Sequence, residues 1–195
     1  MAATVSRLRV VLDKLFTKHL FTTNVVTCGA LLGVGDACVQ GMNIAWHKKK
    51  DAQLPEYDLK RTGRMVVIGL ALGPFNHFWY ALLDKWVKGP GAQMVLKKIC
   101  LDQAVAGPFF CSMFLSGTTI LEGGGVENAK SEVKEKFLKI YMVDWCFWPM
   151  AQFINFKFLP TKYRVAYVST ATLIWNSFLS YMKHKNVPAN EEHVH

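Results

Sequence analysis

Several polar side chains lie inside long apolar stretches of this sequence, where their chemistry needs an explanation. They are Asp36, Asn76, His77, Gln152, Asn155 and Lys157. Gln152 and Asn155 are three residues apart and so share one helix face, which we expect to point inward because amides facing lipid are costly. Such groups can line a path for small solutes, or they can join helices through hydrogen bonds of about 1 kcal/mol each. We favour the structural interpretation and keep the path open as the alternative.

Patterns typical of catalysis or metal binding are not found in the sequence. There is no glycine-rich phosphate loop, no cluster of metal ligands and no nucleophile signature with its base. The five cysteines are scattered and indicate buried, inert thiols rather than disulfides. For His77, we favour a neutral imidazole that is satisfied by a neighbour. We therefore expect neither an enzyme nor a bound cofactor or metal.

Long uncharged runs must position these side chains. Charged residues are only 19% of the chain, and the runs cover 20–35, 65–83, 103–121 and 165–182, with a shorter one at 145–159 that Lys157 interrupts. A helix needs about 20 mainly apolar residues to cross a bilayer. The sequence therefore predicts an all-α, polytopic membrane protein with about four spanning helices, or five if the short run also crosses. A soluble helical bundle is the less favoured alternative.

The remaining segments are more polar. Residues 1–19 form a basic amphipathic segment, interpreted either as a targeting element or as an ordinary packed helix. Residues 126–141 show apolar positions at helical spacing and predict a second amphipathic helix. We expect 20–182 to be one membrane domain and 183–195 to be a polar tail. Pro74, Pro108 and Pro149 lie within apolar runs and predict kinked helices.

The formal net charge of +9 belongs to the parts outside the apolar runs and favours anionic partners. The candidate contacts are Lys48, Lys49, Lys50, Lys97 and Lys98. They can attract RNA phosphates or anionic lipid head groups, and the sequence leaves both open. Basic residues occur in most connecting segments, so counting them does not fix the orientation in the membrane.

The motifs along the chain resemble the Mpv-seventeen and peroxisomal membrane protein 2 family, over nearly its whole length. The matching residues are Gly73-Pro74, His77, Trp79-Tyr80, Lys98, Asp102-Gln103, Pro108, Asp144-Trp145, Trp148-Pro149, Gln152, Asn155-Phe156, Pro160, Arg164, Trp175-Asn176-Ser177 and Ser180-Tyr181. The family has no established catalytic residues to carry over.

This resemblance implies an organellar membrane protein, in the mitochondrial inner membrane or alternatively in the peroxisomal membrane. The stretch from Asp144 to Pro149 and the ending from Leu179 to Lys183 look like those of a member associated with assembly of the mitochondrial ribosome. Other members are discussed as weakly selective channels for small solutes. The partners implied are the lipid bilayer and the mitochondrial ribosome, taken here as its large subunit, and a homo-oligomer stays open.

Overall fold

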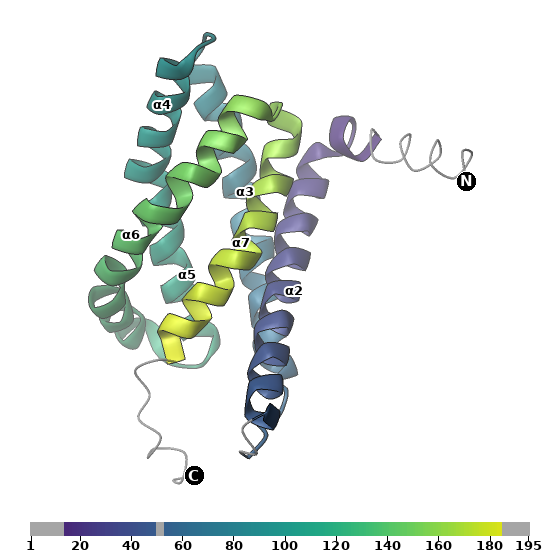
Figure 1. Cartoon of the computed structure of the whole chain (residues 1–195), viewed down its shortest axis with the longest axis vertical. Coiled ribbons are helices and arrows are strands. Elements are labelled where there is room, and N and C mark those ends of the chain that lie inside the picture. The colour runs from purple at the N-terminus through teal and green to yellow at the C-terminus, as the bar shows by residue number, and fades with distance from the viewer. Residues whose placement is uncertain (1–13, 50–52, 185–195) are drawn as a thin grey trace, which may run out of the picture.

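The structure, a computed structural model, describes residues 14–49 and 53–184, which form helices joined by short loops (Figure 1). The helices are α2 (Leu20–Lys49), α3 (Leu59–Trp86), α4 (Ala92–Leu101), α5 (Gly107–Leu121), α6 (Gly125–Phe158) and α7 (Thr161–His184), with a π-helix, η1 (Asp102–Ala106), between α4 and α5. The predicted all-α fold is confirmed. Most of the segment 1–19 and of the tail 183–195 lies outside the described residues.

Long helices run up and down the long axis of the molecule (Figure 1). Helix α2 packs mainly against α3 and α7, and α5 packs mainly against α6. The main apolar cluster, which includes Leu83, Phe156 and Val165, joins α2, α3, α4, α6 and α7. A second cluster, with Leu115, Ile140 and Trp175, joins α5, α6 and α7. The core therefore lies between the group of α2, α3 and α7 and the pair of α5 and α6.

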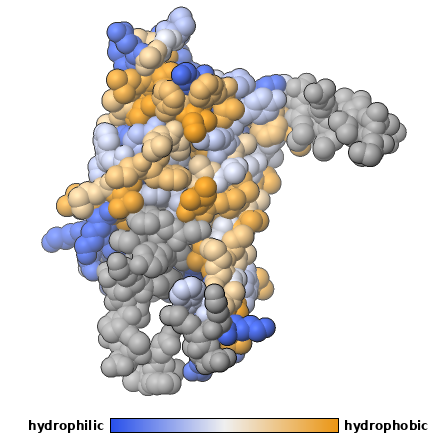
Figure 2. Space-filling model, viewed as in Figure 1, coloured by the Kyte–Doolittle hydropathy of each residue, from blue (hydrophilic) through white to orange (hydrophobic). Residues whose placement is uncertain are grey.

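Three segments have the length and hydropathy of a membrane span: Leu20–Lys48, Leu59–Trp86 and Ala92–Leu121. Their outward faces carry large apolar side chains such as Val26, Phe78 and Phe109. Hydrophobic surface covers much of the visible face (Figure 2). The structure thus confirms a polytopic membrane protein. Helices α6, with 34 residues, and α7, with 24, are long enough to span but more polar, and α6 continues the predicted amphipathic helix 126–141 directly into the run 145–159.

Helices α2 and α3 approach each other closely through glycine. A Cβ atom on Gly69 would lie 2.6 Å from the carbonyl oxygen of Cys28, and one on Gly73 would lie 2.7 Å from the Cα of Val25. On α2, a Cβ on Gly33 would lie 2.6 Å from the side chain of Val66. The small-residue pattern of α2 therefore lies at a tight helix contact, as such residues do in membrane proteins.

Two of the three prolines lie inside helices, Pro74 in α3 and Pro149 in α6. Pro108 is the second residue of α5, directly after η1. In η1 the backbone N–H of Gly107 reaches Asp102 O, five residues back, instead of Gln103 O. The carbonyl of Gln103 is thereby released, and it accepts a hydrogen bond from Tyr141 Oη at 2.8 Å. The π-helix thus replaces the regular ladder where proline already removes one donor.

Candidate functional site: a polar core and a basic end

A network of polar side chains is buried where α3, η1 and α6 meet. Asp102 accepts hydrogen bonds from Trp79 Nε1 at 2.7 Å and from Gln152 Nε2 at 2.6 Å. Gln152 Nε2 also donates to Tyr80 Oη at 2.8 Å, and Gln152 Oε1 accepts from Asn155 Nδ2 at 2.7 Å. Gln152 and Asn155 are 2% and 0% exposed. The predicted inward face of this pair is confirmed.

A second buried pair lies beside this network. Gln103 Nε2 donates to Asp144 Oδ2 at 2.9 Å, and both side chains are buried. Because Asp102 and Gln103 are consecutive in η1, this short segment contacts α6 at two places, near Gln152 and near Asp144. We call these hydrogen-bonded residues the polar core.

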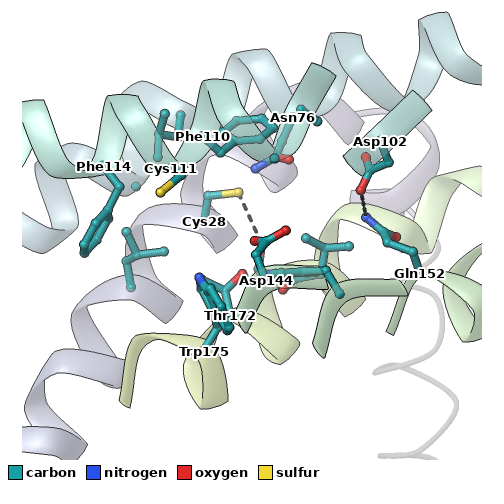
Figure 3. Close-up of a pocket in the computed structure, with 18 of the residues that line it drawn as sticks. Cys28, Asn76, Asp102, Phe110, Cys111, Phe114, Asp144, Gln152, Thr172 and Trp175 are labelled. Carbon is teal, nitrogen blue, oxygen red and sulfur yellow. Dashed lines mark hydrogen bonds between the residues drawn. The ribbon is translucent and has the colours of Figure 1, made fainter. Parts of the chain in front are cut away.

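A cavity of about 110 Å³ lies next to the polar core (Figure 3). Its polar lining includes Asn76, Asp102, Gln103, Asp144, Gln152 and Ser169, and its apolar lining includes Phe110, Phe114, Trp148 and Trp175. At roughly 30 Å³ per water, this space suits three or four waters or a solute of similar size. Its lining residues include two carboxylates and no lysine, arginine or histidine.

The candidate path residues do not share one site. Asn76 and Gln152 line the cavity, and Asn155 lies directly behind Gln152. Lys157 is exposed on the outside of α6, with its Nζ 4.9 Å from the centre of the Phe153 ring. It therefore does not line the cavity.

His77 is held on the contact between α2 and α3. Asn24 Nδ2 lies 2.9 Å from His77 Nδ1, and the Phe21 ring meets the imidazole edge to face. The geometry fits a neutral imidazole that accepts from the amide, which confirms the interpretation that a neighbour satisfies this histidine.

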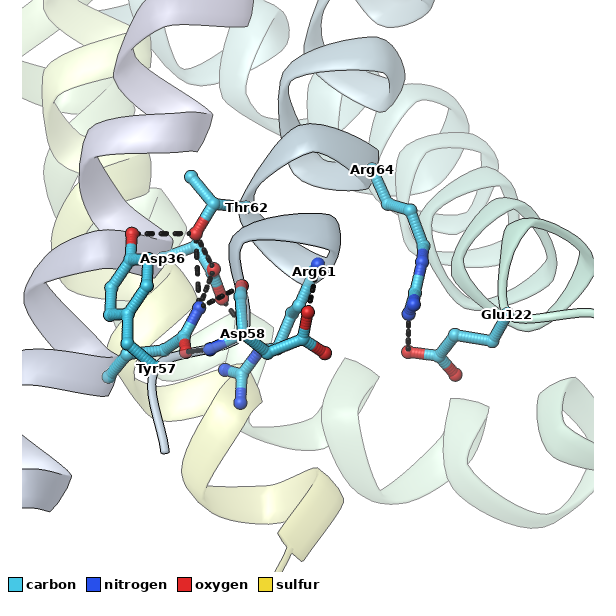
Figure 4. A network of polar contacts seen from close by, with 8 residues as sticks. Asp36, Tyr57, Asp58, Arg61, Thr62, Arg64 and Glu122 are labelled. Carbon is cyan, nitrogen blue, oxygen red and sulfur yellow. Dashed lines mark hydrogen bonds and ion pairs between the residues drawn. The ribbon is translucent and has the colours of Figure 1, made fainter. Parts of the chain in front are cut away.

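Asp36 belongs to a separate network at the α2–α3 turn (Figure 4). Its carboxylate accepts from Arg61 Nε, Thr62 Oγ1 and Gln40 Nε2, each at 2.8 Å. Gln40 also bonds the backbone of Asp58 through both of its amide atoms. The network closes this end of the helix pair and leaves no oxygen of Asp36 available to a solute path.

The opposite end of the molecule is tied together by Asp84. Its carboxylate accepts from Lys98 of α4 and from Thr161 and Arg164 of α7. Arg164 Nε also donates to Leu159 O at 3.2 Å, and its side chain is buried. The family-motif arginine therefore joins the ends of α3, α6 and α7.

Around this cluster the surface is strongly basic, and we call it the basic end. It is defined by the exposed lysines Lys14, Lys18, Lys85, Lys88, Lys97 and Lys157. In the described segments 14–20, 84–98 and 157–164, the one acidic residue is Asp84, which is already bound to cations. The α2–α3 turn at the other end carries both signs, for example Glu56, Lys60 and Arg64.

The five candidate basic contacts are divided between the two ends. Lys48 is exposed near the α2–α3 turn, whereas Lys97 is exposed at the basic end. Lys98 is paired with Asp84 and its side chain is 13% exposed. The side chain of Lys49 and all of Lys50 lie outside the described residues. These lysines therefore do not form one surface.

The tryptophans of the motif have different surroundings. Trp148 packs against Trp175 with ring centres 6.1 Å apart, one turn from the cavity residues Asp144 and Gln152. Trp145 is 48% exposed and stacks edge to face on Tyr141. Cys28 is buried as expected, but Cys38, Cys100 and Cys146 are exposed, which corrects the expectation of buried thiols for these three.

Two groups of residues in these hydrogen-bond networks were not predicted from the sequence. Tyr80, Trp79 and Tyr141 were not recognised as partners of the polar core, although each carries a polar atom that must be bonded when buried. Asp84 was not singled out because its partners are 14, 77 and 80 positions away.

Comparisons with known proteins give a family model and several relatives that match this chain. The sequence model of the Mpv17 / PMP22 family matches residues 119–180. The chain is 34% identical to PXMP2/4 family protein 4 of Dictyostelium discoideum over 85% of its length and 87% of the relative. It is 33% identical to the mitochondrial inner membrane protein Mpv17 of Xenopus laevis, over 89% of its length and 96% of the relative. It is 30% identical to protein SYM1 of Saccharomyces cerevisiae, over 89% of each chain. No solved structure matches.

Proposed function

We propose, on the premise that this chain belongs to the Mpv17 / PMP22 family and is a multi-pass protein of the mitochondrial inner membrane, that its basic end supports assembly of the mitochondrial ribosome. The partner is the large ribosomal subunit. The single observation that carries the proposal is the collection of exposed lysines at one end of the bundle, where the one carboxylate of the described segments is already bound to Lys98 and Arg164.

The chemistry of this end suits an RNA backbone. Lysines attract phosphates without reading sequence, and the attraction falls as salt rises because bound counterions are released. Lys85 and Lys88 precede a turn in which Gly89 and Gly91 have φ angles of 113° and 110°, and Lys97 lies on the following helix. Lys88 therefore lies in the turn itself, with Lys85 in the last turn of α3 and Lys97 on α4.

Sedimentation of mildly solubilised mitochondria tests this proposal. We expect the full chain to travel with a ribosomal subunit at low salt and to be released as salt rises. The variant Lys88→Gln/Lys97→Gln should lose this association, whereas Lys48→Gln/Lys60→Gln, with the same charge change at the other end, should keep it. Association that survives high salt, or that depends equally on both ends, contradicts an electrostatic contact at the basic end.

A second candidate function, passage of small solutes, is supported by the cavity. The space holds only a few waters, and its polar lining could replace part of the hydration of a small solute. Conductance of the purified protein in planar bilayers tests it, with Phe114→Trp narrowing the cavity from its apolar wall. A conductance that Phe114→Trp leaves unchanged excludes a route through this cavity.

A further inference from the structure

A shallow hollow lies on the outer surface between α5 and α6. These helices are joined by a short turn and pack against each other as an antiparallel pair (Figure 1). The hollow has a volume of about 350 Å³, and its apolar wall includes Ile120 of α5 with Val126, Ala129 and Val133 of α6. Ile120 and Val126 are 48% and 61% exposed, so the hollow is open to the surroundings of the bundle. It shares no lining residue with the cavity beside the polar core.

The charge of this hollow is positive. Among its described lining residues the charged ones are Lys130 and Lys134, and no carboxylate is present. Lys130 Nζ lies 2.8 Å from Glu127, but the two side chains are 69% and 85% exposed, and so exposed a pair contributes little. Lys134 is exposed and makes no ion pair within the part of the chain that the structure describes. The hollow therefore favours an anion.

These two lysines can direct their charges toward the membrane surface. Side chains on a helix lean toward its N-terminus, which for α6 is the end next to Glu122. Glu122 pairs there with Arg64 at 3.8 Å, and both side chains are partly exposed, as charges at the polar boundary of a bilayer are. The exposed charges of α6 continue as far as Lys139. Both Lys130 and Lys134 therefore lie within the polar layer at this end.

Apolar side chains continue the hollow toward the middle of the membrane. Leu138 follows Lys134 by four positions, lies on the same face of α6 and is 62% exposed. On α5, Phe109 precedes the lining residue Ser112 by three positions and is 38% exposed. This part of α5 belongs to a segment with the composition of a membrane span. Along one line the surface thus changes from cationic to apolar, as a phospholipid changes from phosphate to acyl chain.

We propose that the hollow between α5 and α6 binds an anionic phospholipid. Its phosphate lies against Lys130 and Lys134, and an acyl chain lies over Phe109 and Leu138. Basic pockets between membrane helices bind anionic head groups in this way. A soluble anion would leave the apolar wall uncovered, and a zwitterionic phospholipid carries a cation that the lysines repel. The site is independent of the proposed ribosome contact, because it lies toward the α2–α3 turn and not at the basic end.

Photolabelling in vesicles tests this proposal. The full chain is reconstituted into phosphatidylcholine vesicles that contain a small fraction of phosphatidylglycerol with a photoreactive group in one acyl chain. Labelled peptides are then mapped by mass spectrometry. We expect the label to concentrate around Phe109 and Leu138 relative to Val67, an exposed apolar residue of α3. Phosphatidylcholine with the same photoreactive chain should label the three positions to similar extents.

Charge variants measure the contribution of the two lysines. From the usual strength of attraction between a lysine and an anionic membrane, Lys130→Gln/Lys134→Gln should reduce labelling of the hollow by phosphatidylglycerol about thirtyfold. The matched control Lys60→Gln/Lys139→Gln makes the same charge change at exposed positions that do not line the hollow. Its labelling should stay at the level of the original protein.

Filling the hollow gives an independent test. Val126→Trp adds volume at an exposed lining position without changing charge and should reduce the labelling several-fold, whereas Ser131→Trp, exposed outside the hollow, should not. Four results overturn the proposal: equal labelling by the two phospholipids; equal loss in both lysine pairs, which indicates general attraction by surface charge; full labelling of Val126→Trp; or displacement of the label by oleate as effectively as by unlabelled phosphatidylglycerol, which identifies a fatty-acid site.

Discussion

Gln152 on α6 and Asp102 in η1 are joined by a hydrogen bond of 2.6 Å, although they are 50 positions apart in the sequence. Gln152 also bonds Tyr80 and Asn155, so a single side chain connects η1, α3 and α6. This geometry favours the structural interpretation of the buried amides. They join helices, and the cavity lies beside them.

Replacing Gln152 with leucine should therefore destabilise the protein. The change removes three hydrogen bonds and leaves Asp102 and Asn155 short of partners inside the bundle. At about 0.6 kcal/mol, and at most about 1.7, per hydrogen bond in a membrane protein, the loss should be about 2 kcal/mol or more. Thermal unfolding in mild detergent measures it, and Gln93→Leu, the same change at an exposed position, serves as the control. Equal melting temperatures for the two variants would refute a structural role for Gln152.

A methyl group at Gly69 should separate α2 from α3. The added Cβ would lie 2.6 Å from Cys28 O and 2.8 Å from the Cα of Gly29, both backbone atoms that cannot simply rotate away. We expect Gly69→Ala to cost roughly 1–3 kcal/mol, as other overpacked contacts do. Gly63 lies on the same helix with nothing within 4 Å of its Cβ position, so Gly63→Ala should be neutral or stabilising by about 0.5–1 kcal/mol. The fraction of folded protein, measured as the temperature rises, distinguishes the two variants. A smaller loss of stability for Gly69→Ala than for Gly63→Ala would contradict the close contact between α2 and α3.

Neutralising Asp36 should weaken the α2–α3 turn. Asp36→Asn removes the negative charge that binds Arg61, whose side chain is 22% exposed. It also replaces the carboxylate oxygen that accepts from Thr62 and Gln40 with an amide nitrogen, which donates. Because Arg61 keeps some contact with solvent, the cost should be at most about 3 kcal/mol, the lower limit for breaking a fully buried pair. Limited proteolysis within residues 50–58 reports opening of this end. The control Glu56→Gln removes an exposed charge nearby, and the protease should cleave it at the rate of the original protein. Faster cleavage of both variants would attribute the effect to net charge and not to the Asp36 network.

Arg164 should not tolerate replacement by lysine. Its guanidinium reaches Asp84 and Leu159 O in two directions, whereas an ammonium is a single point charge on a more flexible stem. We expect Arg164→Lys to cost about 1.5–3 kcal/mol, the value of a hydrogen bond to a charged group. Arg64→Lys provides the matched control, because Arg64 pairs with Glu122 at 3.8 Å and is 28% exposed. A similar loss of melting temperature in both variants would show that the geometry of Arg164 is unimportant.

The sequence predicts the helices well because their signals are local. The uncharged runs correspond to α2, α3, α5 and α7, and the spacing of Gln152 and Asn155 correctly indicates an inward face. Helical periodicity depends only on neighbours along the chain, and burial follows from it.

Tertiary partners were harder to predict. Trp79 is recognised from the sequence only as a motif residue, yet its indole N–H donates to Asp102. Lys48 and Lys97 were grouped by their charge, and only the antiparallel course of the helices places them at opposite ends. Such relationships arise from packing between segments that are far apart in the sequence, which composition and periodicity do not encode.

The π-helix η1 holds one more residue between Asp102 and Gly107 than an α-helical turn would. Deleting one residue here, such as the exposed Val105, would make Asp102 the fourth residue before Gly107, so the same N–H to O bond would close an ordinary α-helical turn. Because this bond is kept, Asp102 and α5 would keep nearly the same relative rotation, whereas a deletion inside the regular part of α5 would rotate the residues on its two sides by about 100°. Asp102 and Gln103 would still face Gln152 and Asp144, and Pro108, which has no N–H, would leave the Gln103 carbonyl available to Tyr141. The extra residue of η1 is therefore the one place in this segment where the chain can shorten by a residue and still assemble the polar core.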